Sequence, residues 1–599
     1  MEPMDRRTFL SGLTSSLVTA SAISLPALRA SAAQYPPTAA QQAPASAAAG
    51  CWLDVCAPFV VEDPALNLST EILLTAACFP GVEGFRDPQY TTEYQILLFD
   101  PRGREIPIGQ SSRLVIPAMH PTVVNMGEVA GRKKFWGSAK VRLVPRGEQT
   151  TRAGDLFSAG FVRWKTPESM DNVHAHPAAA STLHGRFNYS MPFPPLYEYH
   201  CAFILFNPND TESYGVVRVV DRMGQTVGQR AYKLRPRHTL AYSVADLKTA
   251  DSPGEALTVG STPAGKLRQG GVIVVTNDSE AVSFANTMIK GRRGATFSVE
   301  HPLHFQDSTV KPARESPYGP NRSFPAEALL YTPMLFSGRQ FGGLELETRL
   351  YMSSSRWREE ALWLMPFVTD ERGMIVWVSN RDDQFPARVL PTEVSSQGLL
   401  RLTEFQSCRI DARGLPLPAG FSGGYGVATI PPTSHSLMKV EVRAANWDRV
   451  AFTHFRPGGH FHRRYREVTE RGGVATDYII SGCQVRGSKE NRQYDCLLAL
   501  MNIEFEDERT GTPKLQLFGS SGLVAEKSLG EFPPLACRHF LVSELFPGLQ
   551  TEPGHPLTIR MLDSNTMVVA SALHIDYRRR DIALEHGSDR HSTYFDYKC

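Results

Sequence analysis

Residues 215–229, GVVRVVDRMGQTVGQ, alternate apolar and polar side chains, turn at Gly224 and then resume the alternation. Successive side chains of a β-strand point to opposite faces, so a period of two residues predicts a strand with one buried face. Asp221 opens the turn and Gly224 closes it, a spacing that is typical of a tight hairpin. The stretch therefore predicts two antiparallel strands joined by a short turn.

This strand, turn and strand recur three more times along the chain. The other copies are YQILLFDPRGREIPI with Asp100 and Gly103, LWLMPFVTDERGMIVWV with Asp370 and Gly373, and KLQLFGSSGLVAEK, where Gly519 replaces the aspartate and Gly522 remains. A proline follows each hairpin, at Pro117, Pro236, Pro391 and Pro533. Two further strands then close each unit, the first with alternating apolar pairs at Val141/Leu143, Val272/Val274, Val440/Val442 and Ile559/Met561.

A repeat of this kind indicates a duplicated unit of roughly 120–150 residues. We predict an all-β fold of tandem antiparallel β-sandwich modules over residues 51–192, 193–322, 323–472 and 473–599, the third with an insertion. The modules resemble bacterial immunoglobulin-like sandwich domains in a general way, although the Cys…Trp…Cys pattern of antibody domains is absent. Two larger two-sheet domains, each of roughly twice the module length, are the alternative organisation.

Composition excludes several classes of protein. The net charge is +2, so the chain lacks the basic excess of a dedicated nucleic-acid binder. A hydrophobic content of 42% is typical of a folded chain rather than a disordered one. Beyond the N-terminus no apolar run reaches the ~18 residues that a membrane-spanning helix needs. We therefore expect no transmembrane span in the mature chain and no nucleic-acid partner.

The N-terminus carries paired arginines, Arg6 and Arg7, followed by Thr-Phe-Leu and a weakly apolar run that ends at Ala30-Ser31-Ala32. This segment resembles a bacterial twin-arginine signal peptide over residues 1–32, which implies export of the folded protein. Residues 33–50 are rich in Ala, Pro and Gln and predict a flexible linker. We expect the mature protein in the periplasm, on the cell surface or secreted.

Nine cysteines would meet an oxidising compartment after export. Cys51 with Cys56, and Cys483 with Cys496 or Cys537, are candidate disulfides, although connectivity does not follow from sequence. Cys78, Cys201 and Cys496 instead fall at similar places in apolar strands, as small buried hydrophobes do. No CxxC…CxxC spacing is present, which excludes a zinc ribbon.

A histidine pair follows the last strand of each module: His174 and His176, His301 and His304, His460 and His462, and His586 and His591. An H-x-H segment in extended conformation points both imidazoles to one side, as two ligands of one metal ion require. The interpretation that we favour is structural, because a duplicated module would carry such residues as contacts between modules. A metal is the one cofactor that the sequence indicates.

No H-E-x-x-H, P-loop or dinucleotide-binding motif is present. Trp447, at a turn, and Trp136 are candidates for stacking on a sugar. The sequence therefore predicts an exported, non-catalytic scaffold, adhesin or ligand-binding protein of the cell envelope, with envelope polysaccharide or another protein as partner. The alternative is an exported metalloprotein or glycan-acting enzyme, for which the insertion at residues 381–426 carries acidic residues at Asp382, Asp383, Glu404 and Asp411.

Overall fold

The computed structural model describes residues 53–589 apart from 65–67, 79–90, 109–112, 118, 132–133, 145–155, 166–169, 175, 180–186, 259–265, 280–283, 294–296, 301–302, 307–329, 355–361, 380–392, 395–399, 431–435, 456–474 and 505–508. Arg6, Arg7 and the predicted signal and linker lie outside the described residues.

The second module shows the repeated architecture most simply, as two five-stranded antiparallel sheets ordered β14-β13-β17-β11-β20 and β16-β15-β12-β18-β19. The opening stretch forms β13 and β14, and alternate residues of β13 are buried, as predicted. The strands are β11 (Phe187–Phe193), β12 (Tyr199–Phe206), β13 (Ser213–Asp221), β14 (Thr226–Leu234), β15 (Thr239–Ser243), β16 (Thr249–Ala250), β17 (Gly271–Asn277), β18 (Phe284–Gly291), β19 (Phe297–Glu300) and β20 (Leu303–Gln306), with the short helices α3 (Pro253–Thr258) and η4 (Lys266–Gln269).

The first sheet of the fourth module repeats this order strand for strand, as β35-β34-β37-β31-β40. Its second sheet is β32-β33-β38-β39, in which β36 pairs with β33 as β15 pairs with β12, while β32 takes the place of β16 as the short fifth strand. Its elements are β31 (Thr476–Cys483), β32 (Arg486–Gly487), β33 (Arg492–Asn502), β34 (Lys514–Gly519), β35 (Gly522–Ser528), β36 (Cys537–Leu541), α5 (Val542–Leu545), β37 (Leu557–Asp563), β38 (Val568–Asp576), β39 (Asp581–Glu585) and β40 (Ser588–Asp589).

In the first module the same pairings recur, but β1 also pairs with β2 and joins the two sheets into one of ten strands. Its elements are β1 (Leu53–Asp63), β2 (Leu68–Cys78), β3 (Thr91–Phe99), β4 (Glu105–Ile106), β5 (Arg113–Pro117), β6 (Thr122–Asn125), α2 (Met126–Val129), β7 (Phe135–Val144), β8 (Leu156–Lys165), β9 (Met170–His174) and β10 (His176–Ala179).

The third module is also one ten-stranded sheet, joined by the β21–β22 pair. It consists of β21 (Leu330–Phe341), β22 (Leu344–Ser354), β23 (Leu362–Thr369), β24 (Ile375–Val378), β25 (Glu393–Val394), β26 (Leu400–Leu402), β27 (Ser407–Asp411), η6 (Ala412–Gly414), β28 (Phe421–Ile430), β29 (Ser436–Ala444) and β30 (Arg449–Phe455).

The predicted correspondence between the strands of the third module and those of the other modules was wrong by one strand. β28, and not β29, pairs with both β21 and β23, as β17 pairs with β11 and β13 in the second module. Much of the expected insertion is therefore the module's own β26, β27 and β28. The alternation that identifies a strand does not identify which strand it is, and this allowed the shift.

The prediction of a mostly β fold of antiparallel sheets in tandem modules is confirmed. No helix in the described part of the chain is long and apolar enough to cross a membrane. The six cysteines whose side chains the structure describes, Cys56, Cys201, Cys408, Cys483, Cys496 and Cys537, are all buried. Cys483, Cys496 and Cys537 are free thiols, so the candidate disulfide of Cys483 with Cys496 or Cys537 is wrong.

The aspartate of the repeated hairpin has a defined structural role. Asp221 Oδ1 accepts hydrogen bonds from the backbone N–H groups of Met223 and Gln225, both at 2.9 Å. Asp100 and Asp370 make the same two bonds in their own hairpins. An aspartate that accepts from the backbone ahead of it fixes a tight turn, which explains why this residue recurs.

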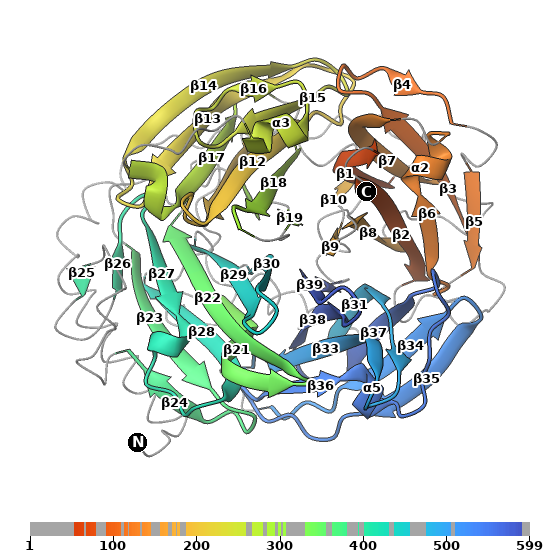
Figure 1. Cartoon of the computed structure of the whole chain (residues 1–599), viewed down its shortest axis with the longest axis vertical. Coiled ribbons are helices and arrows are strands. Elements are labelled where there is room, and N and C mark those ends of the chain that lie inside the picture. Colours follow the sequence, from red (N-terminus) through yellow and green to blue (C-terminus); the bar gives the residue numbers. More distant parts are fainter. Residues whose placement is uncertain are drawn as a thin grey trace, which may run out of the picture.

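The four modules lie around a common axis and close into a ring, with the first module beside the fourth (Figure 1). The strands nearest the axis are β9, β19, β30 and β39, and each contacts the corresponding strand of both neighbouring modules. The ring therefore has an approximate fourfold arrangement, built from one duplicated unit.

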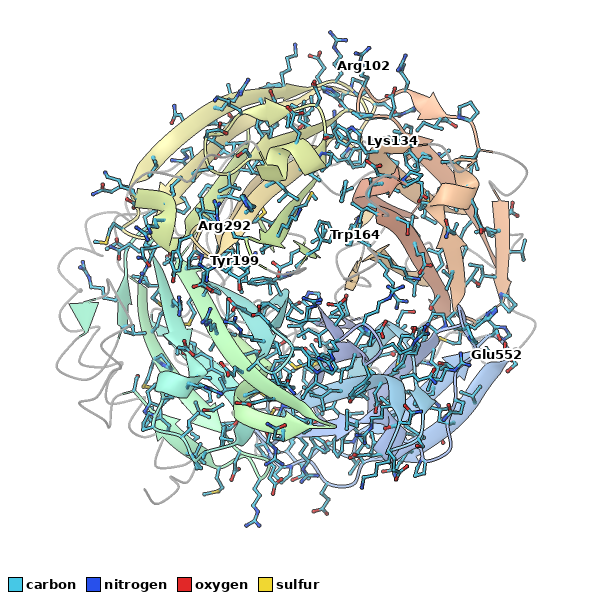
Figure 2. All side chains as sticks on the ribbon, in the orientation of Figure 1. Arg102, Lys134, Trp164, Tyr199, Arg292 and Glu552 are labelled. Atoms are coloured by element: carbon cyan, nitrogen blue, oxygen red, sulfur yellow. The ribbon has the colours of Figure 1, made fainter. Side chains whose placement is uncertain are left out.

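Each repeated hairpin docks on a turn of the next module. A Cβ atom added to Gly103, Gly224 or Gly373 would lie 2.3, 2.6 or 2.0 Å from a backbone carbonyl oxygen of the following module, on Pro236, Glu404 or Pro534. The fourth hairpin meets the first module, where Gly522 lies against His120. Figure 2 shows Arg102, in the first of these hairpins, at the outer edge of the ring where the first module meets the second.

The receiving turns share an unusual backbone. Their hydrogen bonds span residues 117–120, 235–238, 403–406 and 533–536. The third residue of each turn is not glycine and yet has a positive φ, of 60° at Met119, 61° at Arg237, 55° at Phe405 and 61° at Leu535. Residues other than glycine rarely adopt a positive φ, because this conformation is strained. Its recurrence in all four turns indicates that the packing of the neighbouring hairpin stabilises it.

Apolar packing continues across three of the junctions. Cys56, Phe99 and Phe206 form one cluster between the first and second modules. The core of the second module extends to Val450 and Phe452 of the third. The third and fourth modules share one large core. These junctions are therefore packed like domain interiors.

Candidate functional site

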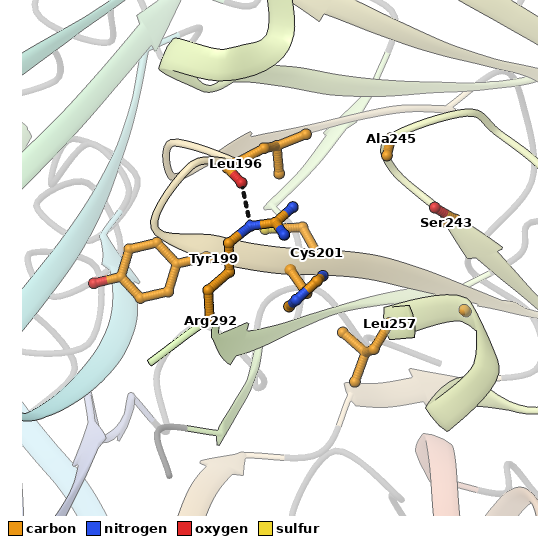
Figure 3. A pocket seen from close by; sticks show the side chains of 9 residues that line it. Leu196, Tyr199, Cys201, Ser243, Ala245, Leu257 and Arg292 are labelled. Atoms are coloured by element: carbon orange, nitrogen blue, oxygen red, sulfur yellow. Dashed lines mark hydrogen bonds between the residues drawn. The ribbon is translucent and has the colours of Figure 1, made fainter. Parts of the chain in front are cut away.

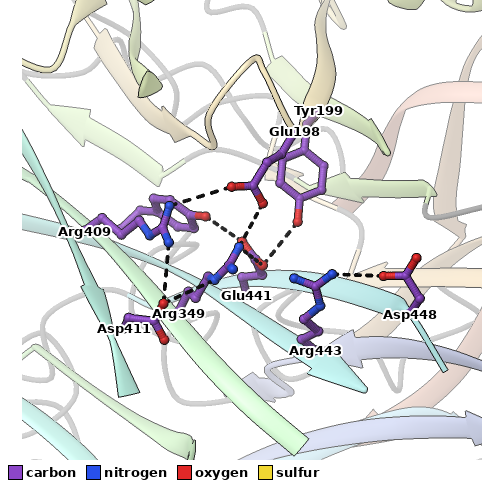
Figure 4. A network of polar contacts seen from close by, with 9 residues as sticks. Glu198, Tyr199, Arg349, Arg409, Asp411, Glu441, Arg443 and Asp448 are labelled. Carbon is purple, nitrogen blue, oxygen red and sulfur yellow. Dashed lines mark hydrogen bonds and ion pairs between the residues drawn. The ribbon is translucent and has the colours of Figure 1, made fainter. Parts of the chain in front are cut away.

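A buried polar network lies between the second and third modules (Figure 4). Glu441 on β29 is its centre and is 0% exposed. One carboxylate oxygen accepts hydrogen bonds from the Tyr199 hydroxyl at 3.1 Å and from Arg349 Nη1 at 3.2 Å. The other accepts from the Tyr351 hydroxyl at 2.5 Å. Both oxygens are thus satisfied, as a buried carboxylate requires.

The strand register brings these groups together. Arg349 on β22 is the direct cross-strand partner of Glu441 on β29. Tyr351 lies two residues further along β22 and therefore faces the same side of the sheet. Tyr199, at the start of β12, comes from the second module and completes the set.

Two further carboxylates and a second guanidinium extend the network. Arg349 Nη1 lies 2.9 Å from Glu198 Oε2, and Arg349 Nε lies 3.6 Å from Asp411 Oδ2. Arg409 contacts the same two carboxylates, Asp411 at 3.5 Å and Glu198 at 3.8 Å. Three carboxylates against two guanidiniums leave the network close to charge balance, with the second module contributing Glu198.

The surroundings shift the acidity of the two glutamates in opposite directions. Burial raises the pKa of Glu441, and the charge of Arg349 and the hydrogen bond from Tyr351 only partly offset it. Burial would also raise the pKa of Glu198, but hydrogen bonds from Tyr197 and Arg349 outweigh it and hold that pKa below its usual value. Burial and the charge of Glu441 raise the pKa of Tyr351 well above its usual value, so this hydroxyl stays a donor.

A second set of ionisable groups lies on the strands nearest the axis. Glu300 on β19 and Lys439 on β29 form a buried ion pair of 2.7 Å between the second and third modules. The rings of His454, on β30, and His586, after β39, meet edge to face with centroids 4.6 Å apart. His586 Nδ1 also lies 3.1 Å from Glu585 Oε1. These groups, too, connect one module to the next.

The structure places the predicted histidines as follows. His586 is at the junction described above, while His174 ends β9, His176 begins β10 and His304 lies in β20. His301, His460, His462 and His591 lie outside the described residues. Within the described part of the chain, no group of three or more His, Cys, Asp or Glu side chains could hold a metal ion.

Both predicted tryptophans are half-buried. Trp136 packs against the core of the first module. Trp447 meets the ring of Tyr577 edge to face, at a centroid distance of 5.5 Å, and so contacts the fourth module from the third. Glu404 and Asp411, from the expected insertion, lie in a docking turn and in the polar network, whereas Asp382 and Asp383 lie outside the described residues.

A small pocket lies in the second module, between the start of β12 and α3 (Figure 3). Its volume of about 10 Å³ accommodates roughly one water molecule. Arg292 lines it and donates from Nε to the carbonyl of Leu196 at 2.6 Å. Burial raises the pKa of the Cys201 thiol beside it to about 12, so this sulfur stays protonated and is a poor nucleophile. The pocket offers too little space for a substrate.

One buried histidine predicts how stability depends on pH. His574, on β38, is 3% exposed, and burial together with the charge of Arg163 lowers its pKa to about 3. Its imidazole is therefore neutral in the folded state at pH values where the unfolded chain, with a pKa near ~6.5, binds a proton. The stability that this group contributes is present above pH ~6.5 and is lost as the pH falls toward about 3. Arg163 and Glu585 are the charged groups that act on it.

We expect His574→Gln to flatten this part of the pH profile. Between pH 7 and 4.5 the wild-type free energy of unfolding should fall by about 2–3 kcal/mol more than that of the variant, at about 1.4 kcal/mol per pH unit below ~6.5. Urea denaturation at both pH values measures the difference. Parallel profiles for the two proteins would contradict the assignment.

Sequence analysis did not single out Glu441 or Arg349. In SLMKVEVRA the charges of Lys439, Glu441 and Arg443 alternate with apolar residues, a pattern that ordinarily indicates a solvated face. Here that face is covered by the second module, so Lys439 and Glu441 are buried. The sequence feature that could have predicted this site is a strand face of mixed charge in a chain of repeated modules, where a neighbouring module can cover it.

Comparison with known proteins identifies no family. No family model matches the chain, and no curated protein matches it. A solved structure entitled "Biofilm associated protein - BSP domain" is similar at 10% identity, over 90% of this chain and 95% of that chain, with a TM-score of 0.13.

Proposed function

We propose that the protein is a non-catalytic scaffold of the cell envelope, exported as a ring that holds partner molecules on its outer rim. The observation that carries the proposal is the use made of its buried charges. Arg349 of the third module forms ion pairs with Glu441 of the same module and with Glu198 of the second. Charged groups that pair with one another between modules in this way stabilise the arrangement of the modules.

The outer edge strands of the second and fourth modules are the surfaces that we assign to a partner. Among the described strands, β14 and β35 are the outermost of their sheets, and their side chains are largely exposed. Each has a bulge at the same place in the hairpin, with Val227 and Val524 both 44% exposed. Exposed valines on the edge strand of a sheet are typical of a surface that pairs with another protein chain.

Co-sedimentation with isolated envelope fractions tests the proposal. We expect the purified mature chain to bind at least one fraction saturably, and Val227→Asp with Val524→Asp to reduce this binding about tenfold, a loss of ~1.4 kcal/mol. Val115→Asp is the matched control: Val115, 47% exposed, lies on β5, an outer strand of the first module, to which the proposal assigns no partner, so this variant should bind normally. Binding that is unchanged in the double variant, or absent from every fraction, would contradict it.

Elemental analysis of the same protein, purified without chelator, separates this function from the alternative of a metalloprotein. The scaffold predicts no tightly held metal. Copper, zinc or iron in stoichiometric amount, lost in His460→Ala with His462→Ala, would overturn the proposal.

A further inference from the structure

The junctions of the ring repeat one backbone hydrogen bond. Just after the docking turn, Thr239 donates its N–H to the carbonyl of Pro101 at 2.9 Å, across the first and second modules. Ser407 donates to Arg222 at 3.2 Å across the second and third, and Cys537 donates to Asp370 at 3.1 Å across the third and fourth. Each donor stands two residues after the residue of positive φ.

The corresponding residue in the first module is Pro121, two residues after Met119. Proline has no backbone N–H, so this hydrogen bond cannot form where the fourth module meets the first. We call this junction the seam. A net backbone hydrogen bond contributes about 0.5–1.5 kcal/mol, and the seam lacks it.

The described residues of the seam include both polar and apolar contacts. The hydroxyls of Thr75, on β2, and Thr558, on β37, lie 2.9 Å apart. Arg163, on β8, is 2% exposed and donates to the carbonyl of Gly482 at 2.6 Å, and Leu73 lies against the same glycine. Glu71 is the cross-strand partner of Arg163, so the carboxylate that offsets this charge belongs to the first module and not to the fourth.

Chain connectivity also distinguishes the seam. The other three junctions join modules that follow one another along the chain, so the chain itself connects the two sides of each junction. The seam joins modules at opposite ends of the described chain. It is a head-to-tail contact, which the same surfaces on a second copy can satisfy equally well.

We propose that the ring opens at the seam and there exchanges with a second copy of the chain, the fourth module of one copy docking on the first module of the other. The first three junctions stay closed in both copies. The inference does not depend on the proposed envelope partner, because it concerns only contacts of the chain with itself.

Mixed cysteine variants test the exchange. Thr75→Cys and Thr558→Cys are made as separate proteins, each with Cys599→Ser, then mixed and oxidised. We expect a disulfide-linked dimer that neither protein forms alone. The matched control is a mixture of Arg222→Cys and Ser407→Cys, which probes the junction of the second and third modules. The seam mixture should give about tenfold more dimer than the control, which corresponds to a difference of ~1.4 kcal/mol. Equal yields, or no dimer from the seam mixture, would overturn the proposal.

Hydrogen exchange of the backbone amides tests the same proposal on the unmodified protein, without any substitution. Backbone amides of β31, which faces the seam, should exchange about tenfold faster than those of β11 and β21, its counterparts in the second and third modules. Equal protection in all three strands would contradict opening at the seam.

Discussion

Replacing Glu441 by alanine is expected to lower the free energy of unfolding by about 3–5 kcal/mol. The substitution takes the cross-strand carboxylate from Arg349, which is 17% exposed and keeps Glu198 and Asp411, and it leaves the buried Tyr199 and Tyr351 hydroxyls without their acceptor. Losing one member of a buried ion pair costs this much because the remaining charge stays out of water. Differential scanning calorimetry measures the effect as a fall in the transition temperature.

Asp448→Asn supplies the control for this prediction. Asp448 also pairs with an arginine of the third module, at 2.9 Å from Arg443, but its side chain is 66% exposed. An exposed ion pair contributes about 0–1 kcal/mol, so the control should shift the transition only slightly. Similar shifts for the two variants would show that the network at Glu441 is not a desolvated junction.

The fold was predictable because its signals are local. The alternation in residues 215–229 and the Asp221–Gly224 turn depend only on neighbouring residues, and both are present as predicted. The hairpins of the other modules could be predicted because their sequences repeat the same pattern. What failed was the assignment of β28, since a strand's neighbours in the sheet are set by contacts between residues far apart in sequence.

The junctions were much less predictable. Histidines at module ends were expected between modules, and His586 does meet His454 of the preceding module. Glu441 and Lys439 gave no such indication, because strands with alternating charge are buried only when another module covers them. The positive φ of Arg237 and Phe405 was equally hidden, since neither residue is a type that favours this conformation. Packing between modules, rather than local preference, determines these features.

Substitution of the turn glycine Gly373 by alanine is expected to destabilise the junction of the third and fourth modules by about 3–5 kcal/mol. Part of the cost is local, since Gly373 has a φ of +82°, where a residue with a Cβ is strained. The larger part arises because the new Cβ would lie 2.0 Å from the carbonyl oxygen of Pro534, so the two modules must move apart.

Gly554→Ala isolates the local cost. Gly554 has nearly the same φ, of +79°, but no atom lies within 4 Å of an added Cβ. This variant should lose only about 1–2 kcal/mol, the ordinary penalty of a left-handed conformation. The difference between the two variants in urea denaturation is therefore the contribution of the docked turn. Equal losses of unfolding free energy in the two variants would show that the Gly373 hairpin does not pack tightly on the fourth module. The docking of each hairpin on the next module would then not be the contact that holds the ring together.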